Sequence, residues 1–270
     1  MLHRMAQLLA NADFVLVSCP PERRKPWSVV LRGLGVDGEL VIPELTGIGL
    51  ENNSFASNLP VLRVSFGPLS MRNRIVKRLF DVAISVVLLV LLSPLMLLVA
   101  LAIKLDSKGP VLFEQRRVGR GNRFFNIFKF RSMRVESCDA AGNVSTLRDD
   151  DRITRVGRII RATSIDELPQ LLNVVLGDMS LVGPRPHALG SRAENRLFWE
   201  IDQRYFTRHA VKPGITGIAQ VRGFRGATEK HRDLTDRLQS DLEYLAGWSL
   251  WRDIVILART GLVLFHRNAY

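Results

Sequence analysis

The chain has 270 residues, of which 47% are hydrophobic and 24% charged, and its formal net charge is +12 at pH 7. This length allows one large domain or two small ones, and the positive charge indicates an anionic partner: nucleic acid, phospholipid or a phosphorylated substrate. The two cysteines, Cys19 and Cys138, are far apart and outside any C-x-x-C motif, which excludes a disulfide scaffold or a cysteine–zinc site.

The N-terminal part reads as a small α/β module. Residues 1–12 lack the pattern of a secretory signal, and the apolar runs ADFVLVSCP and LPVLRVS predict strands. The segment between them, WSVVLRGLGVDGELVIPEL, predicts a helix or a strand, followed by another strand. We expect residues 1–66 to form part of a Rossmann-like, nucleotide-binding-like module, although it has no G-x-G-x-x-G motif, and residues 67–76 to form a linker.

A long apolar run follows. Residues 82–103 carry no charge and cover roughly 33 Å as a helix, enough to span a bilayer, so we expect a membrane helix over 79–105. Basic residues flank both ends, however, so the positive-inside rule gives no orientation. Ser93-Pro94 interrupts the run, and a proline there bends the helix and frees a carbonyl that Ser93 is expected to bond. A kinked, re-entrant helix satisfies both observations, while length alone favours a spanning one.

The segment GPVLFEQRRVGRGNRFFNIFKFRSM predicts a β-hairpin around a Gly-Arg-Gly-Asn turn. Its two-residue period places Lys129 and Arg131 on one face, with Phe128 and Phe130 on the other. Four arginines then recur every third residue, close to one helical face: Arg152, Arg155, Arg158 and Arg161. Such a stripe is either a solvated surface or a phosphate-facing one.

Two adjacent carboxylates come next, in TSIDELPQLLNVVLGDMSLVGPRP. Ser164 and Glu167 have the Ser-x-x-Glu spacing of a capping box, and Pro169 is tolerated only in a first helical turn, so a helix is expected to start at the acids. Asp166 and Glu167 are also candidates for catalysis. The later turns LVGPRP and VKPGITGIAQVRG predict rigid backbone that a ligand can approach closely.

The C-terminal segment, SDLEYLAGWSLWRDIVILARTGLVLFHRN, predicts amphipathic helices. Trp248 and Trp251 beside Arg252 favour a membrane interface, and packing against the domain core is equally compatible.

Six motifs occur in order between Lys77 and about Gly226: KRLFD, the Ser-Pro of the apolar run, KFRSM, DRITRVGRIIRATSIDELPQLLNV, GDMSLVGPRP and KPGITGIAQV. In this combination the chain resembles the bacterial sugar transferases called monotopic polyprenyl-phosphate phosphoglycosyltransferases, and most of all the undecaprenyl-phosphate hexose-1-phosphate (glucose or galactose) transferases. The resemblance implies an α+β catalytic domain over 77–270, with a re-entrant helix, a short hairpin and interfacial helices. It also implies the cytoplasmic face of the bacterial inner membrane.

Members of that family transfer a sugar-1-phosphate from a UDP-sugar to undecaprenyl phosphate and release UMP, which starts exopolysaccharide, capsule or O-antigen assembly. Carried over, Asp166 is the nucleophile that forms an aspartyl-phosphosugar, Glu167 assists it, and both carboxylates are expected to hold Mg²⁺. The resemblance favours glucose-1-phosphate as the transferred group. The phosphate-binding residues expected on the same grounds are Lys129, Arg131, Arg161, Pro184, Arg185, Pro186, Lys212 and Gly214.

Some features differ from the family pattern or have another reading. Ile218 and Arg222 stand where the family often has tryptophan and asparagine, and His187 is expected to be structural. Full-length members of the hexose subgroup commonly carry four transmembrane helices ahead of this region, so a truncated or late-starting form is expected. The expected partners are a UDP-sugar, undecaprenyl phosphate and membrane lipid, without nucleic acid; a homo-oligomer is left open.

Two other classes of protein are weighed against this reading. A nucleic-acid-binding protein would account for the charge of +12, but the basic residues cluster at the membrane flanks and around the acids. A membrane-anchored scaffold without catalysis would leave the acidic pair and the Gly-Pro-Arg-Pro turn unexplained.

Overall fold

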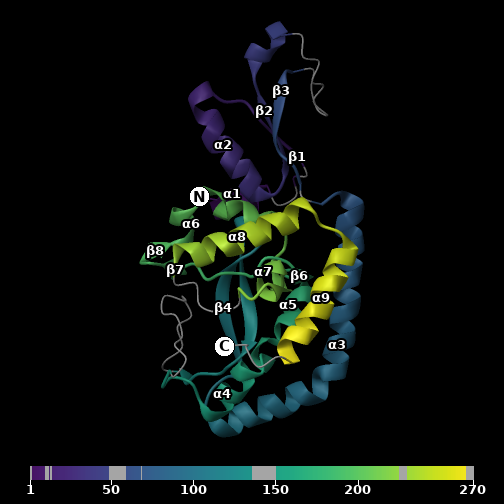
Figure 1. Ribbon diagram of the computed structural model, residues 1–270, viewed down its shortest axis with the longest axis vertical. Coiled ribbons are helices and arrows are strands. Elements are labelled where there is room, and N and C mark those ends of the chain that lie inside the picture. The colour runs from purple at the N-terminus through teal and green to yellow at the C-terminus, as the bar shows by residue number, and fades with distance from the viewer. Residues whose placement is uncertain are drawn as a thin grey trace.

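The computed structural model describes residues 2–9, 12, 14–48, 59–67, 69–135, 150–224 and 230–265, so Cys138 lies outside the described part. The chain combines helices and strands, as expected for an α+β protein. A small N-terminal module sits at one end, a long helix runs along one side, and the C-terminal helices cover a central hairpin (Figure 1).

The N-terminal module is a three-stranded sheet with two α-helices and a 3₁₀ helix. Its elements are α1 (Leu2–Leu8), β1 (Phe14–Val17), α2 (Pro21–Leu34), β2 (Asp37–Val41), η1 (Pro43–Ile48) and β3 (Val61–Ser65). β1 and β2 are parallel and joined through α2, and β3 pairs antiparallel with β2. The two strands expected from the apolar runs are confirmed, and the segment between them forms a helix followed by a strand. The described residues contain one βαβ unit, so a wider Rossmann-like fold stays a prediction.

The module packs closely against the rest of the chain. The Asn122 side chain donates to the Gly33 carbonyl at 2.6 Å, and its amide oxygen lies 2.7 Å from Nδ1 of His209. Gly35 has φ of 67°, and a Cβ there would stand 2.6 Å from the backbone of Ala210. Only glycine tolerates both the left-handed backbone and so close an approach. The module is therefore docked directly onto the domain that follows it.

The long helix α3 (Met71–Asp106) starts earlier than the expected 79–105, so the segment expected as a linker, 67–76, is helical from Met71 onward. Ser70 caps the helix by accepting from the Asn73 amide. Charged residues fill its first turns, which is why the apolar run alone underestimated its length. It is long and apolar enough to cross a membrane, and 11% of its most apolar window is buried. Exposed apolar surface of this extent is typical of a membrane-associated segment.

The helix continues through Pro94. Ser93 Oγ donates to the Val90 carbonyl at 2.8 Å, the carbonyl that a proline at 94 leaves without its helical N–H donor. The expected local repair is thus confirmed. Figure 1 shows α3 descending along one side of the molecule and then bending to pass beneath it. A re-entrant path through a membrane stays a prediction.

The hairpin is confirmed. β4 (Leu112–Val118) and β5 (Phe124–Phe130) pair antiparallel around the turn η2 (Arg120–Asn122), with Leu112 opposite Phe130. The later elements are α4 (Arg155–Ala162), η4 (Ile165–Glu167), α5 (Gln170–Leu176), β6 (Ser180–Val182), β7 (Arg192–Ala193), β8 (Arg196–Leu197), α6 (Phe198–Ile201), η5 (Gln203–Ala210), β9 (Gly214–Thr216), α7 (Ile218–Val221), α8 (His231–Ala246) and α9 (Leu250–Phe265).

The main hydrophobic core joins the hairpin to the C-terminal helices. Its buried members include Ile127 of β5, Val174 of α5, Val182 of β6 and Ile256 of α9. The two tryptophans of the C-terminal segment divide between the roles considered for them. Trp248 packs against this core, whereas Trp251 is 72% exposed on the surface of α9.

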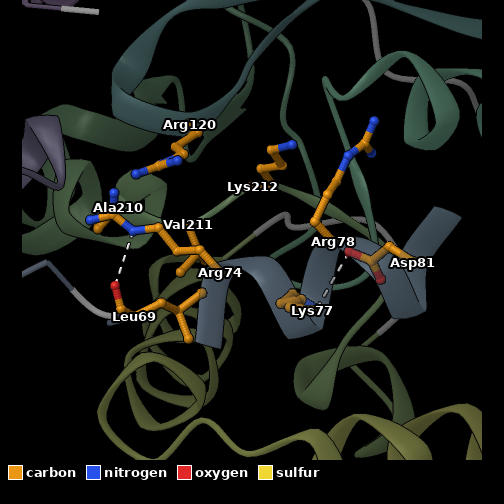
Figure 2. A pocket seen from close by; sticks show the side chains of 9 residues that line it. All are labelled: Leu69, Arg74, Lys77, Arg78, Asp81, Arg120, Ala210, Val211 and Lys212. Carbon is orange, nitrogen blue, oxygen red and sulfur yellow. Dashed lines mark hydrogen bonds and ion pairs between the residues drawn. The ribbon is translucent and has the colours of Figure 1, made fainter. Parts of the chain in front are cut away.

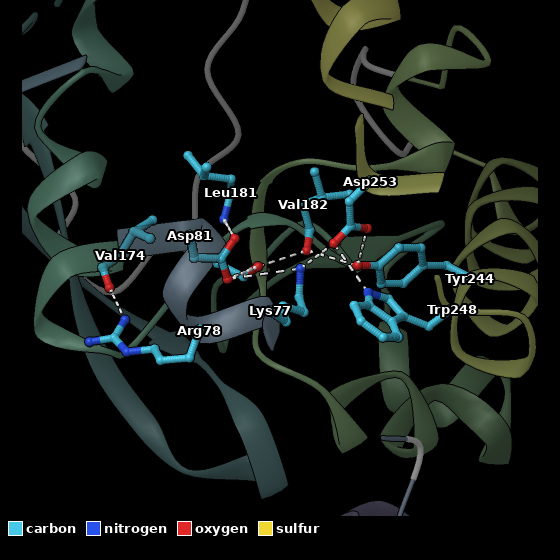
Figure 3. Close-up of polar contacts among 10 residues, drawn as sticks. Lys77, Arg78, Asp81, Val174, Leu181, Val182, Tyr244, Trp248 and Asp253 are labelled. Carbon is cyan, nitrogen blue, oxygen red and sulfur yellow. Dashed lines mark hydrogen bonds and ion pairs between the residues drawn. The ribbon is translucent and has the colours of Figure 1, made fainter. Parts of the chain in front are cut away.

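A buried polar network fastens α3 to this core (Figure 3). Lys77 Nζ lies 2.6 Å from Asp253, which also accepts from the Tyr244 hydroxyl at 2.8 Å and the Trp248 indole at 3.1 Å. One turn along α3, Asp81 accepts from the Ser180 hydroxyl at 2.7 Å and from the Leu181 amide at 3.2 Å. The KRLFD motif therefore carries two charges that set the position of α3 against β6, α8 and α9.

Candidate active site

A cavity of about 390 Å³ lies between α3, the turn η4 and α9. Its wall contains five charged residues: Lys129, Arg161, Asp166, Glu167 and Arg185. Leucines of the two helices line the same cavity, among them Leu88 and Leu92 from α3 and Leu257 from α9. The cavity thus joins a charged wall to apolar surface that continues onto the membrane-associated helix.

The acidic pair does not form the expected capping box. Ser164 has a left-handed backbone, with φ of 56°, and its side chain makes no cap hydrogen bond. Asp166 and Glu167 lie in the short turn η4, and α5 begins only at Gln170, after Pro169. The capping prediction is wrong because the Glu167 carboxylate turns away from the backbone and bonds two cations instead.

Glu167 is held by Lys129 and Arg185. Lys129 Nζ lies 2.7 Å from Oε1, and the Arg185 guanidinium donates to both carboxylate oxygens. Burial by itself would raise the pKa of Glu167, but Arg185 and then Lys129 outweigh it, so the pKa falls well below its ordinary value. Glu167 is therefore a fixed anion that orients two cations.

Asp166 stands in a different environment. Lys129 Nζ is 4.0 Å from Oδ2, too far for a hydrogen bond, and the side chain is 13% exposed. Burial raises the pKa of Asp166, the charge of Lys129 offsets part of this rise, and the neighbouring Glu167 adds to it. A desolvated carboxylate that is poorly stabilised as an anion is a better nucleophile than a paired one.

Asn173 aligns the acidic turn with the hairpin. Its buried side chain accepts from the Phe128 amide at 2.9 Å and donates to the Asn126 carbonyl at 2.7 Å, so α5 is stitched to β5. Lys129 follows directly on β5. The register of that strand therefore decides where the lysine meets Glu167.

Arg185 is positioned through three successive carbonyls. The Pro184 carbonyl accepts from the Gly214 amide at 3.0 Å, and the Pro186 carbonyl from Arg117 at 3.4 Å. Between them, the Arg185 carbonyl accepts from Arg208 at 2.8 Å. With the flanking proline rings limiting φ, the guanidinium is presented to the cavity on a rigid backbone. Gly214 thus serves as a backbone partner of this turn.

Arg208 is the buried support of that turn, with 2% of its surface exposed. Its Nε donates to Asp241 at 2.9 Å, and another nitrogen lies 2.8 Å from His187 Nδ1. His187 also lies 2.9 Å from the Tyr205 hydroxyl, in line with its expected structural role. Spacing in the sequence gave no signal for Arg208, because its partners come from elements far apart along the chain.

The structure brings only some of the expected phosphate-binding residues to the acids. Lys129, Arg161 and Arg185 line the cavity with them, whereas Arg131 and Lys212 do not. Arg131 is 3% exposed and donates to the carbonyls of Ser107 at 2.7 Å and Lys108 at 2.6 Å, so it secures the chain after α3. The alternation of side chains along the strand, which predicted Arg131 on the same face as Lys129, does not extend to Arg131 because β5 ends at Phe130.

The KPGITGIAQV segment contributes two residues to the cavity that the sequence motifs did not single out. Thr216 and Gln220 line the cavity, and Thr216 Oγ1 lies 2.7 Å from Thr260 Oγ1 of α9. The two positions where the family pattern differs lie elsewhere. Ile218 is buried in the core, and Arg222 pairs with Glu243 at 2.6 Å on the surface.

Magnesium can be tested against this donor set. Carboxylate oxygens suit Mg²⁺, which in phosphate-handling sites takes one or two carboxylates and completes its shell with water and substrate oxygens. Across the described residues, no group of three or more His, Cys, Asp or Glu is arranged to hold a metal. Both oxygens of Glu167 already accept from cations. The site therefore fits Mg²⁺ through Asp166 and substrate phosphates, and not through a complete protein cage.

The fold and the cavity together define a membrane-associated α+β domain with a charged site suited to a phosphorylated ligand. The chain belongs to the bacterial sugar transferase family, which it matches over residues 72–267.

Three relatives illustrate the similarity. The undecaprenyl-phosphate glucose phosphotransferase of Komagataeibacter xylinus is 54% identical over 204 residues, 75% of this chain and 38% of the relative. The exopolysaccharide production protein PSS of Rhizobium leguminosarum bv. phaseoli is 50% identical over 186 residues, 69% of this chain and 93% of the relative. The UDP-glucose:undecaprenyl-phosphate glucose-1-phosphate transferase of Xanthomonas campestris pv. campestris is 45% identical over 235 residues, 85% of this chain and 48% of the relative. The chain thus spans less than half the length of two of these relatives.

Proposed function

We propose that this chain transfers hexose-1-phosphate, with glucose as the favoured hexose, from a UDP-sugar to undecaprenyl phosphate and releases UMP. The observation that carries the proposal is the contrast between two neighbouring carboxylates in one cavity: Glu167 fixed by two cations, and Asp166 desolvated beside them. The names of the similar proteins support the same reaction, and one of them points to the start of exopolysaccharide synthesis.

In the proposed first step, a carboxylate oxygen of Asp166 attacks the β-phosphorus of the UDP-sugar. A bond forms between that oxygen and phosphorus, and the bond from phosphorus to the bridging oxygen breaks, so UMP leaves with the electron pair. In the second step, a phosphate oxygen of undecaprenyl phosphate attacks the same phosphorus, and the Asp166 carboxylate is released. The product is undecaprenyl-diphospho-hexose.

The cations lower the cost of bringing these anions together. Arg185 and Lys129 remain aligned by Glu167, so they need no reorganisation when phosphate oxygens arrive. Arg161 lines the same wall. Bound Mg²⁺, held by Asp166 and the diphosphate, would supply further neutralising charge.

The acceptor is proposed to enter from the membrane side. Leu88 and Leu92 of α3 and Leu257 of α9 offer apolar surface within the cavity, where the first isoprene units of a polyprenyl chain would lie. We place the domain on the cytoplasmic face of the bacterial inner membrane, with α3 re-entrant. Cysteine labelling at positions 72 and 108, in a chain with Cys19 and Cys138 replaced by serine, should report one side only. Labelling from opposite sides would establish a spanning helix.

The reaction can be tested with membranes that contain this chain. They would be incubated with Mg²⁺, undecaprenyl phosphate and, in turn, UDP-glucose, UDP-galactose and UDP-N-acetylgalactosamine, and UMP would be measured. We expect UMP release with UDP-glucose, and lipid-linked sugar only when undecaprenyl phosphate is present. UMP release should disappear in Asp166→Asn, and Asp178→Asn, a change outside the cavity, is the matched control for that variant. If no UDP-sugar yields UMP, the proposed reaction is wrong.

A further inference from the structure

A second cavity, of about 60 Å³, lies at the start of α3 (Figure 2). Arg74 and Arg78 reach it from α3, and Arg120 and Lys212 lie across from them. We call this space the basic cavity. It shares no lining residue with the cavity at Asp166, so it is a separate place in the fold.

The charged groups around the basic cavity are not equally engaged. Arg78 donates to the carbonyls of Val174 and Val175 at the end of α5, and Arg74 Nε donates to the Leu69 carbonyl at 3.0 Å. Asp81, which supplies negative charge to the lining, already accepts from Ser180 and Leu181. The lining thus holds five cationic side chains, among them Lys77, which pairs with Asp253, and one carboxylate, Asp81.

Lys212 is the group left over. Within the described ranges its amino group makes no hydrogen bond and no ion pair. Burial, and after it the charges of Arg78 and Arg120, lower the pKa of Lys212 to about 8 against the opposing pull of Asp81 and Asp178. A partly buried ammonium without a close partner is costly unless an anion joins it.

We propose that the basic cavity binds a phosphoryl group, coordinated by Lys212 and Arg120 with Arg74 beside them. Guanidinium forks and an ammonium are the donors that phosphate oxygens prefer. About 10–15 Å³ of such space holds one water, so the cavity of about 60 Å³ has room for a group of several heavy atoms such as a phosphoryl group.

The rest of such a ligand has a place to lie. A neighbouring cavity of about 100 Å³ shares Arg74 and Arg120 with the basic cavity and is lined on its other side by Gly35 and Val36 of the N-terminal module. A phosphomonoester in the basic cavity would thus contact both the module and the catalytic domain. The same chemistry could come from a soluble phosphorylated compound or from a phospholipid headgroup.

The test measures binding to the full chain in detergent, without UDP-sugar, so that it does not depend on the proposed transfer reaction. Inorganic phosphate would be titrated by calorimetry at pH 7.5 and constant ionic strength. We expect Lys212→Gln and Arg120→Gln each to weaken binding about tenfold or more, as for a lost charge-assisted hydrogen bond. Arg161→Gln, which removes a cation from the other cavity, should leave this binding in place.

A second arm identifies the source of the phosphoryl group and controls for folding. Short-chain phosphatidic acid replaces inorganic phosphate in this arm. If the binding of phosphatidic acid depends on Lys212 and Arg120 and that of inorganic phosphate does not, the ligand is a lipid headgroup. Thermal unfolding without ligand verifies that the variants fold, and Lys212→Arg should keep binding and remove its decline above pH 8. If neither probe depends on Lys212 and Arg120, or if only Arg161→Gln weakens binding, the proposal is overturned.

Discussion

Two groups of carboxylates and cations in this molecule consist of the same residue types, but one holds the fold together and the other lines a cavity. In the network of Figure 3, Asp253 is fully buried and its oxygens accept from Lys77, Tyr244 and Trp248. In the cavity, Glu167 is saturated in the same way by Lys129 and Arg185, but its neighbour Asp166 is not. In the first group, the Asp253 carboxylate is fully hydrogen-bonded without a ligand. In the second group, Asp166 has its nearest cation, Lys129, at 4.0 Å and stays available to a substrate.

The difference shows how position decides what an ion pair does. A buried charge with all its hydrogen-bonding capacity used contributes to holding elements in register, and removing one partner is costly. A carboxylate that lines a cavity and is not hydrogen-bonded to a cation stays available to react with a substrate. Replacing charged side chains by neutral ones in each group tests whether the two groups differ in this way.

The largest expected effect is on catalysis, in Asp166→Asn. Transfer should fall by about a thousandfold or more, because the amide cannot form the acyl phosphate. The fold should not suffer. Since the folded-state pKa of Asp166 is raised, its ionised form costs stability above that pKa, and a neutral side chain removes the cost. Measurements are UMP release and the thermal midpoint; a lower midpoint with retained turnover would contradict both assignments.

The next effect is on stability, in Asp253→Asn. The change removes the 2.6 Å partner of the buried Lys77 and leaves it only Asp81, at 3.8 Å, so we expect a loss of about 3 kcal/mol in the free energy of unfolding, the lower end of the range for a broken buried pair. Denaturant unfolding of the variant measures it. Asp236→Asn, on the exposed side of α8, is the control and should stay within about 0.5 kcal/mol. Equal effects at the two positions would remove the distinction between the network and ordinary surface pairs.

A smaller effect is expected for Arg208→Lys, which tests the support of Arg185. Lysine cannot bridge Asp241 and the Arg185 carbonyl together, so kcat/KM should fall about 10- to 100-fold, equivalent to about 1.5–3 kcal/mol. A purely structural role would lower the thermal midpoint alone. Arg232→Lys, an exposed change on α8, should alter neither quantity.

The smallest effect is a displacement of the pH profile in Lys129→Met. The charge of Lys129 lowers the pKa of Asp166, so its removal raises that pKa, and the acid limb of the rate should move to higher pH. The rate is lost as pH falls through this pKa because the nucleophile becomes protonated. Single-turnover UMP release against pH measures the limb. Lys230→Met should leave it unmoved, and a shift to lower pH would contradict the assignment.

Much of this arrangement could be predicted from local patterns. The hairpin followed from its turn, the Ser93 contact from the neighbouring proline, and the convergence of Lys129, Arg185 and the acids from the motif resemblance. These features depend on short-range geometry or on several motifs that occur in a fixed order.

The rest depends on contacts between distant parts of the chain. Lys77 and Asp253 lie 176 positions apart, and no periodicity in either helix points to the other. Arg131 looked equivalent to Lys129, but the strand ends between them and the arginine turns to the end of α3. The capping box failed in the same way, because a tertiary contact to Arg185 outcompeted the local bond expected for Glu167.

The central claim is that Asp166 carries the sugar phosphate, and one measurement tests it directly. The chain would be mixed with UDP-glucose and Mg²⁺ without undecaprenyl phosphate, quenched within the first turnover, digested and analysed by mass spectrometry. We predict a UMP burst equal to the amount of enzyme and a hexose-phosphate adduct on Asp166, which disappears when undecaprenyl phosphate is added. UMP formation that occurs only with the acceptor present, with no adduct on Asp166, would contradict it.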